Sequence, residues 1–182
     1  PGQLSRTATL NAPDHGIPSG LVQRAARDDH GVAGGAEHAV AAASSSSGSQ
    51  LPSGLMRKFE SSLGADLSGV RVHTGAPSET AADAVGAKAY AVGQDIHFGA
   101  GQYDPSSPGG EHLLAHEVAH TVQQAGGAQR MQRKLAVSSS GDALEIEAVR
   151  AADAMVAGDA AVVSSASGLA RRAVYRNPLV SG

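Results

Sequence analysis

The chain has 182 residues, a formal net charge of −3 and a pI near 6.2, and no basic stripe of the kind that binds nucleic acid. It contains no cysteine, which excludes disulfides and thiolate metal sites and leaves histidine and carboxylate side chains as metal ligands. Neither a run of about 18 apolar residues nor a secretion signal is visible, so the sequence predicts a soluble protein without a membrane span.

Residues 1–50 have the composition of a flexible tail or linker. They contain scattered Gly, Pro, Asp and His and end in AAASSSSGSQ, with little apolar surface to bury. The amphipathic stretch GLVQRAAR at 20–27 predicts a turn or two of helix. Isolated histidines in a polar tail are far more often solvated than metal-bound, so we leave His15, His30 and His38 out of the candidate site.

Organised sequence follows this tail. Apolar residues at helical spacing predict a helix from Pro52 to Gly64, and a short alternating stretch at 70–73 predicts a strand. A second helix is expected at about 77–85. Two alternating runs, 87–92 and 95–98, flank a two-residue turn and indicate a β-hairpin. An edge strand of this small sheet offers main-chain hydrogen bonds to an extended peptide.

The stretch EHLLAHEVAHTVQQA at 111–125 contains the H-E-x-x-H pattern of zinc metallopeptidases in His116, Glu117 and His120. At about 100° per residue, the two histidines lie roughly 40° apart on one face of a helix, so both imidazoles can reach one metal ion. Glu117 lies beside that face, where its carboxylate is placed to act as general base toward a metal-activated water. A separate apolar stripe gives this helix a core face: Leu114, Val118 and Val122. The alternative is two solvated histidines beside an ordinary surface glutamate.

A last helix is expected from Asp142 to Gly158. On a helical wheel Glu145 falls inside an apolar arc, whereas Glu147 lies about 120° from the centre of that arc beside Arg150. The arc contains Leu144, Ala148, Val149, Ala151, Ala152, Met155 and Val156. A buried carboxylate needs a cation or full hydrogen bonding, so we expect Glu145 to be the third metal ligand and Glu147 to be dispensable. The alternative is that Glu145 closes a capping box begun by Asp142.

Four other side chains near these segments carry weaker signals: His73, His97, Tyr103 and His112. We expect His73 and His97 to be structural histidines in strands; the alternative for His97 is that it lines the cleft. His112, one turn before the motif, is expected to be partly exposed, and Tyr103 to pack in a loop rather than to donate to an oxyanion.

Residues 51 to about 158 resemble the core domain of extracellular contractile injection systems (eCIS), a metallopeptidase-like family encoded beside phage-tail-derived injection machines and often fused ahead of toxin domains. The resemblance is carried by LPSGLMRKFESSLGADLSGVRVHTG, AKAYAVGQDIHFGAGQY, HLLAHEVAHTVQQ and LEIEAVRAADAMVAG. The pattern is also similar to the gluzincins, whose third zinc ligand is a Glu on the helix after the metal helix, which Glu145 matches. Val149 departs from that pattern, because such relatives usually have an Asp there as a partner for a ligating histidine.

The expected architecture is therefore an α+β, mainly helical, zincin-like domain with a small β-sheet or hairpin before the H-E-x-x-H helix. We place it at 51–158, between the tail at 1–50 and a C-terminal extension at 159–182.

Two functional hypotheses follow. The first is a zinc-dependent endopeptidase in which His116, His120 and Glu145 hold Zn²⁺ and Glu117 is the general base, acting on a polypeptide substrate or on the chain's own linker. The second is a catalytically weak or inert metal-binding module that loads, docks or processes effector cargo of an injection particle. The resemblance implies residence in the bacterial cytoplasm before loading and extracellular delivery by the particle.

Overall fold

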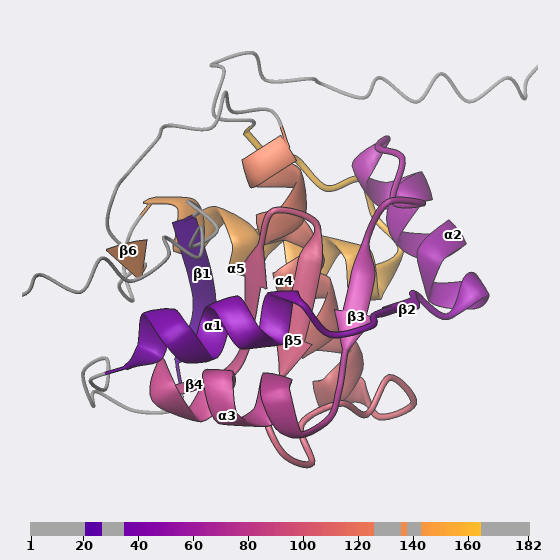
Figure 1. Ribbon diagram of the computed structural model, residues 1–182. Helices are drawn as coiled ribbons and strands as arrows, with labels where there is room; N and C mark the ends of the chain where they lie inside the picture. The colour runs from indigo at the N-terminus through magenta and orange to yellow at the C-terminus, as the bar shows by residue number, and fades with distance from the viewer. Residues whose placement is uncertain (1–20, 27–34, 126–135, 138–142, 165–182) are drawn as a thin grey trace, which may run out of the picture.

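The computed structural model describes residues 21–26, 35–125, 136–137 and 143–164 (Figure 1). The fold is α+β, as the sequence predicts. The described residues form five helices: α1 Ala36–Ser44, α2 Ser53–Leu63, α3 Ala76–Ala84, α4 Pro108–Ala125 and α5 Ala143–Ala157. The same residues form six strands: β1 Leu21–Ala26, β2 Ser49–Gln50, β3 Arg71–His73, β4 Ala87–Val92, β5 Asp95–Phe98 and β6 Ala136–Val137. No helix among these residues is long and apolar enough to cross a membrane.

The strands form one mixed sheet in the order β2-β3-β5-β4-β1-β6. The β4–β5 hairpin is antiparallel, β3 pairs parallel to β5, and β1 pairs antiparallel to β4. Gly93 begins the hairpin turn with φ of 62°, a left-handed conformation that costs glycine little. The predicted hairpin is therefore confirmed, but it is the centre of a larger sheet.

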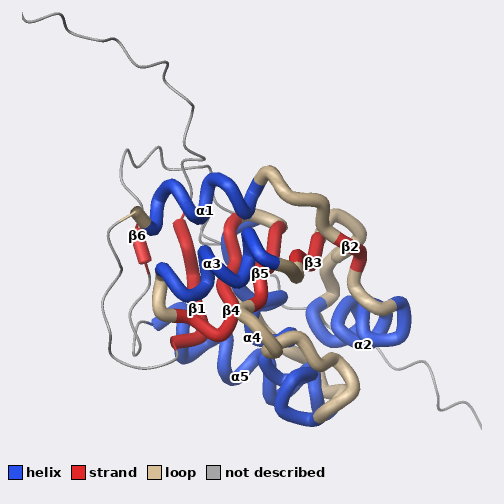
Figure 2. The backbone as a smooth tube through the Cα atoms, turned by 60° about the horizontal axis from the view of Figure 1, so that its bottom comes forward, coloured by secondary structure: helices blue, strands red, loops and turns tan. Residues whose placement is uncertain are grey.

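Helices cover both faces of this sheet. Figure 2 shows α1 and α3 on one side of the strands and α4 and α5 on the other. On the first side a small-residue cluster surrounds Tyr90 of β4: Ala36, Val40, Ala43, Ala81, Ala82, Val85 and Ala87. The larger core lies on the second side, where Phe59, Ile96, Phe98, Leu114 and Met155 are buried. Alanine-rich helices approach the sheet closely, so a core with few aromatic residues still packs.

Four predicted helices, α2 to α5, are confirmed near their expected positions. The end of α2 shows the predicted stop signal: Gly64 has φ of 61°, and its N–H donates to the carbonyl of Glu60 at 2.8 Å. α2 also holds the chain that follows α5, because the N–H of Ala161 donates to the carbonyl of Ser62 at 2.9 Å.

Two segments that the sequence analysis placed in the tail are part of the fold. The helix expected at 20–27 is wrong, because Leu21–Ala26 forms β1 between β4 and β6. Residues 36–44 form α1, which buries Ala36, Val40 and Ala43. Both errors have one cause: long-range packing supplies the order that local composition does not suggest. His38 is exposed, as expected, whereas His15 and His30 lie outside the described residues, and the domain bounds at 51 and 158 stay a prediction.

Candidate metal centre

Helix α4 carries the H-E-x-x-H motif through the middle of the molecule. It packs against β1, β4 and β5 on one side and against α5 on another. Its buried residues therefore include the motif itself: His116, Glu117 and His120, with Glu117 and His120 both 0% exposed. The alternative of solvated surface histidines does not fit this burial.

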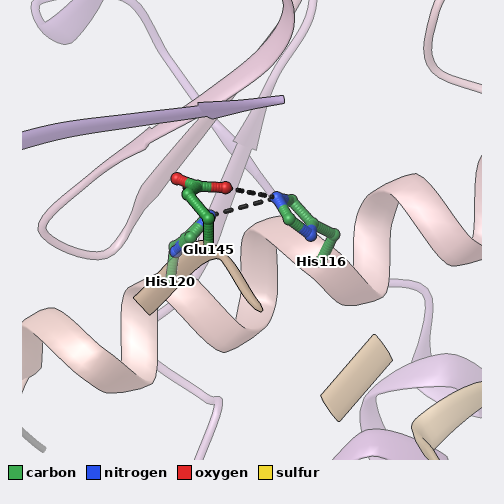
Figure 3. A group of neighbouring side chains, drawn as sticks. All are labelled: His116, His120 and Glu145. Carbon is green, nitrogen blue, oxygen red and sulfur yellow. Dashed lines mark hydrogen bonds and ion pairs between the residues drawn. The ribbon is translucent and has the colours of Figure 1, made fainter. Parts of the chain in front are cut away.

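Helix α5 brings the third group to the same point. Glu145, on the first turn of α5, is buried and directs its carboxylate at both imidazoles (Figure 3). Its Oε2 lies 3.3 Å from His116 Nε2, its Oε1 lies 3.3 Å from His120 Nε2, and the two Nε2 atoms are 3.1 Å apart. The structure thus brings together the three side chains expected to be ligands, although they come from two helices and are 29 positions apart at the extremes, from 116 to 145.

These three separations fit a tetrahedral zinc site. With Zn–N and Zn–O bonds of about 2.0–2.1 Å, tetrahedral geometry places neighbouring ligand atoms about 3.3–3.4 Å apart. The observed values of 3.1, 3.3 and 3.3 Å are therefore close to the edges of such a tetrahedron. The two rings also meet nearly at right angles, with an interplanar angle of 87°, so their Nε2 lone pairs converge from different directions.

The position of Glu145 is as predicted, but the apolar arc around it is not. Leu144 and Val149, which the helical wheel placed in the core, are exposed. The buried residues of α5 are Glu145, Ala148, Ala151, Ala152 and Met155. The arc is shifted because α5 turns its Ala side toward α4, where only small residues allow close approach. Asp142, the proposed start of a capping box, lies outside the described residues.

A residue that the sequence analysis overlooked orients His120. Gln123 is buried, and its Oε1 accepts a hydrogen bond from His120 Nδ1 at 2.7 Å, which leaves Nε2 directed at the cluster. Gln123 Nε2 in turn donates to the carbonyl of Leu144 at 2.9 Å and to Glu147 Oε1 at 3.1 Å. The available signal was its spacing, one turn after His120 on α4. Gln123 thus takes the role that an Asp at the position of exposed Val149 would have had.

Glu147 supports this arrangement from outside the cluster. It is half-buried rather than on a fully polar face, and both the N–H and the hydroxyl of Ser164 donate to its carboxylate at 2.7 Å. Its carboxylate therefore holds Gln123 and the chain after α5 in place. The carboxylate that lies with His116 and His120 in the candidate metal cluster is that of Glu145.

Two carboxylates, those of Glu117 and Glu145, are buried beside the two imidazoles. Burial lowers the pKa of His120, but the hydrogen bond with Glu145, the charges of Glu117 and Glu145 and the bond with Gln123 together raise it above its ordinary value. Two carboxylates buried beside two imidazoles need a compensating positive charge. A divalent cation held by His116, His120 and Glu145 would supply it.

The other four candidates lie outside the cluster. His112 Nε2 pairs with Asp153 at 2.9 Å on the exposed side of α4. His73 and His97 stack on one another at 4.4 Å and bond to Ser46, Asp95 and Ser78, so they are structural, as expected. Tyr103 packs edge-on against Phe98.

Comparison with known families adds one result. The family model of the eCIS core domain matches residues 50–128. The matched segment includes α2 to α4 and therefore His116, Glu117 and His120. The match supports the eCIS family for this part of the chain. The eCIS match ends before α5, so Glu145 is supported as a third ligand by geometry alone. No curated protein and no solved structure matches the chain.

Proposed function

We propose that this eCIS-related domain is a zinc-dependent peptidase. The observation that carries the proposal is the convergence of His116 Nε2, His120 Nε2 and one Glu145 carboxylate at 3.1–3.3 Å, with Glu117 buried next to them. Three protein donors are the set found in catalytic zinc sites, whose fourth position stays open for water or substrate, whereas structural sites use four. Among the described residues, no other group of His and carboxylate side chains meets as a possible metal site.

Each residue of the candidate site then has a defined role. His116, His120 and Glu145 would hold the zinc, which when bound would polarise a carbonyl oxygen and lower the pKa of water to about 7. Glu117 takes the proton from the attacking water as its oxygen adds to the scissile carbonyl carbon. Glu117 then passes that proton to the amine as the C–N bond breaks. The carboxylate is near enough to affect the pKa of His120, so it lies within the electrostatic reach of the cluster.

The family match supports a link to an injection particle. We propose that the polypeptide substrate is effector cargo of that particle or a linker in this chain. Because recognition of cargo needs contacts beyond the cluster, the proposed partner and the proposed chemistry are tested separately.

The test compares two glutamates of α4. Glu117→Gln keeps the shape of the side chain and removes the base, and Glu111→Gln is its matched control, since Glu111 instead pairs with Lys58 at 2.7 Å. We expect about one zinc per chain in the wild type and in both variants, and little zinc in the double variant His116→Ala, His120→Ala. Cleavage of a peptide library, read by mass spectrometry, should fall about 10²- to 10⁴-fold in Glu117→Gln and stay unchanged in Glu111→Gln.

A second function is favoured by the burial of the site. Glu117 and His120 are fully buried, and β1 lies against the same helix, which suits a metal-binding module that docks or loads cargo without cleaving it. Equal zinc in the wild type and in the His116, His120 double variant would refute both functions. Zinc binding without cleavage by the wild type or any variant would favour the metal-binding module, provided that association with the injection particle is unchanged.

A further inference from the structure

We propose that the edge of β4 next to β1 is the peptide-binding edge of the metal centre, and that Leu21–Ala26 fills it as a built-in ligand. This inference rests on the proposed function for its substrate class, an extended polypeptide. It goes beyond that function because it assigns the binding surface and names a segment of this chain as its occupant.

The sheet order defines the surface. β4 pairs with β5 on one side and with β1 on the other. Within the part of the chain that the structure describes, the only further pairing of β1 is with the two residues of β6. β1 comes from far earlier in the chain than the β3–β5–β4 unit that it joins. Without β1, the backbone of β4 would present a row of N–H and C=O groups to an incoming strand.

The occupant lies against the helix that carries the site. β1 contacts α4, as do β4 and β5. Gln23 of β1 pairs with Ala91 of β4, and the carbonyl of Ala91 accepts a hydrogen bond from Gln124, one turn after His120 on α4. β1 therefore runs beside the metal helix, and a substrate chain that took its place on β4 would lie against the same helix.

The edge of β4 is held in a fixed relation to α4. Gln124, one turn after His120, accepts a hydrogen bond from the N–H of Gly93 at 2.7 Å and donates to the carbonyl of Ala91 at 3.3 Å. The end of β4 is thereby tied to the metal helix. A peptide paired with β4 is consequently positioned along its length relative to the cluster, as cleavage at a defined bond requires.

Strand addition recognises main chain and therefore accepts many sequences. β1 pairs antiparallel with β4 at Gln23–Ala91, Arg24–Tyr90 and Ala25–Ala89, then shifts register before Ala26–Ala87. An external peptide can make the same main-chain bonds only after β1 leaves. Because β1 belongs to the same chain, its effective concentration at β4 is on the order of millimolar, and an external peptide at micromolar concentration competes poorly.

The experiment weakens β1 in the full chain and offers the edge a substitute. In an antiparallel pair the N–H groups of alternate residues face the partner strand. Of two consecutive residues, one therefore donates to β4, so prolines at both positions remove one N–H that pairs with β4. The test variant is Gln23→Pro, Arg24→Pro, and its matched control is Gln23→Ala, Arg24→Ala, which keeps both N–H groups. The probe is a fluorescent peptide with the sequence of residues 19–28, SGLVQRAARD, and binding is read by anisotropy.

We expect the proline variant to bind the peptide at least about tenfold more tightly than the wild type and the alanine control. Equal binding to all three proteins, or binding to none, would overturn the inference and leave β1 as an ordinary structural strand. Should the proline variant lose its cooperative thermal transition, Gln23→Gly, Arg24→Gly replaces it, since glycine weakens a strand but keeps its N–H.

Zinc content is measured in the same samples so that the two ideas fail separately. Zinc without tighter peptide binding overturns the assignment of the edge and leaves the proposed function. Tighter peptide binding without zinc supports the edge as a peptide site and overturns the zinc peptidase.

Discussion

Replacing Gln123 by alanine tests whether this side chain makes His120 a metal ligand. The substitution removes the oxygen that accepts from His120 Nδ1 at 2.7 Å, and with it the restraint on the ring and on its tautomer. Loss of such a partner typically lowers metal affinity by about 10- to 100-fold. That range corresponds to about 1.4–2.7 kcal/mol of binding free energy.

Two further variants separate orientation from packing. Gln123→Glu keeps an oxygen for His120 Nδ1 but cannot donate to the Leu144 carbonyl, and it places a second carboxylate beside Glu147. We expect it to bind zinc within a few-fold of wild type and to lose about 1–3 kcal/mol of unfolding free energy. Gln124→Ala is the control, because Gln124 bonds to β4 rather than to His120, and its zinc affinity should be unchanged.

The assay is competition for zinc with a chromophoric chelator, with thermal unfolding of the same samples. The expected order of zinc affinity is wild type, Gln124→Ala and Gln123→Glu together, then Gln123→Ala well below them. Wild-type affinity in Gln123→Ala would refute the reasoning. So would an equal loss in Gln124→Ala, because the effect would then come from the end of α4 as a whole.

Three other perturbations have predicted outcomes. Gly110→Ala should cost about 1–3 kcal/mol of unfolding free energy, because a Cβ there would meet the Asp104 carbonyl. Gly109→Ala should instead stabilise α4 by about 0.5–1 kcal/mol, because its Cβ would have nothing within 4 Å. Chemical denaturation measures both. Burial, aided by the nearby imidazole of the stacked histidine, lowers the pKa of His97 from 6.5 to about 3. The folded state therefore binds fewer protons than the unfolded state between these values. Stability should fall as the pH drops through that window, by up to about 1.4 kcal/mol per unit, and less steeply in His97→Gln at the same metal content. Chelation of zinc should lower the melting temperature of the wild type more than that of Glu117→Gln, which has one buried carboxylate fewer. An equal shift would contradict the expectation that Glu117 is charged in the metal-free protein.

The parts of the site that the sequence could predict are those set by helix geometry. The i, i+4 spacing fixes His116 and His120 on one face of α4, and the wheel places Glu145 on the buried side of α5. These inferences need only 100° per residue and an apolar pattern. Gln123 was accessible by the same geometry, but a neutral amide has many structural uses, and its partner on α5 is set by how the two helices cross.

The parts that the sequence could not predict depend on contacts between distant segments. α1 is an alanine-rich stretch next to a run of serines, and its burial depends on packing against the small residues of α3 and against Tyr90 of β4. β1 alternates poorly between apolar and polar residues, and its strand conformation comes from hydrogen bonds to β4, more than 60 positions later. Local composition describes both segments as a tail because it contains no information about those partners.

The position of β1 also changes how the two functional hypotheses relate. A fully buried Glu117 is a poor base for an external substrate while β1 covers the edge of β4, so in this state the protein has the properties of an inert module. On the proposal made above, release of β1 would expose the β4 edge. Module and peptidase would then be two states of one fold, with the free energy of pairing between β1 and β4 setting the balance between them. Any partner that binds residues 21–26 in extended form would shift that balance toward the open site.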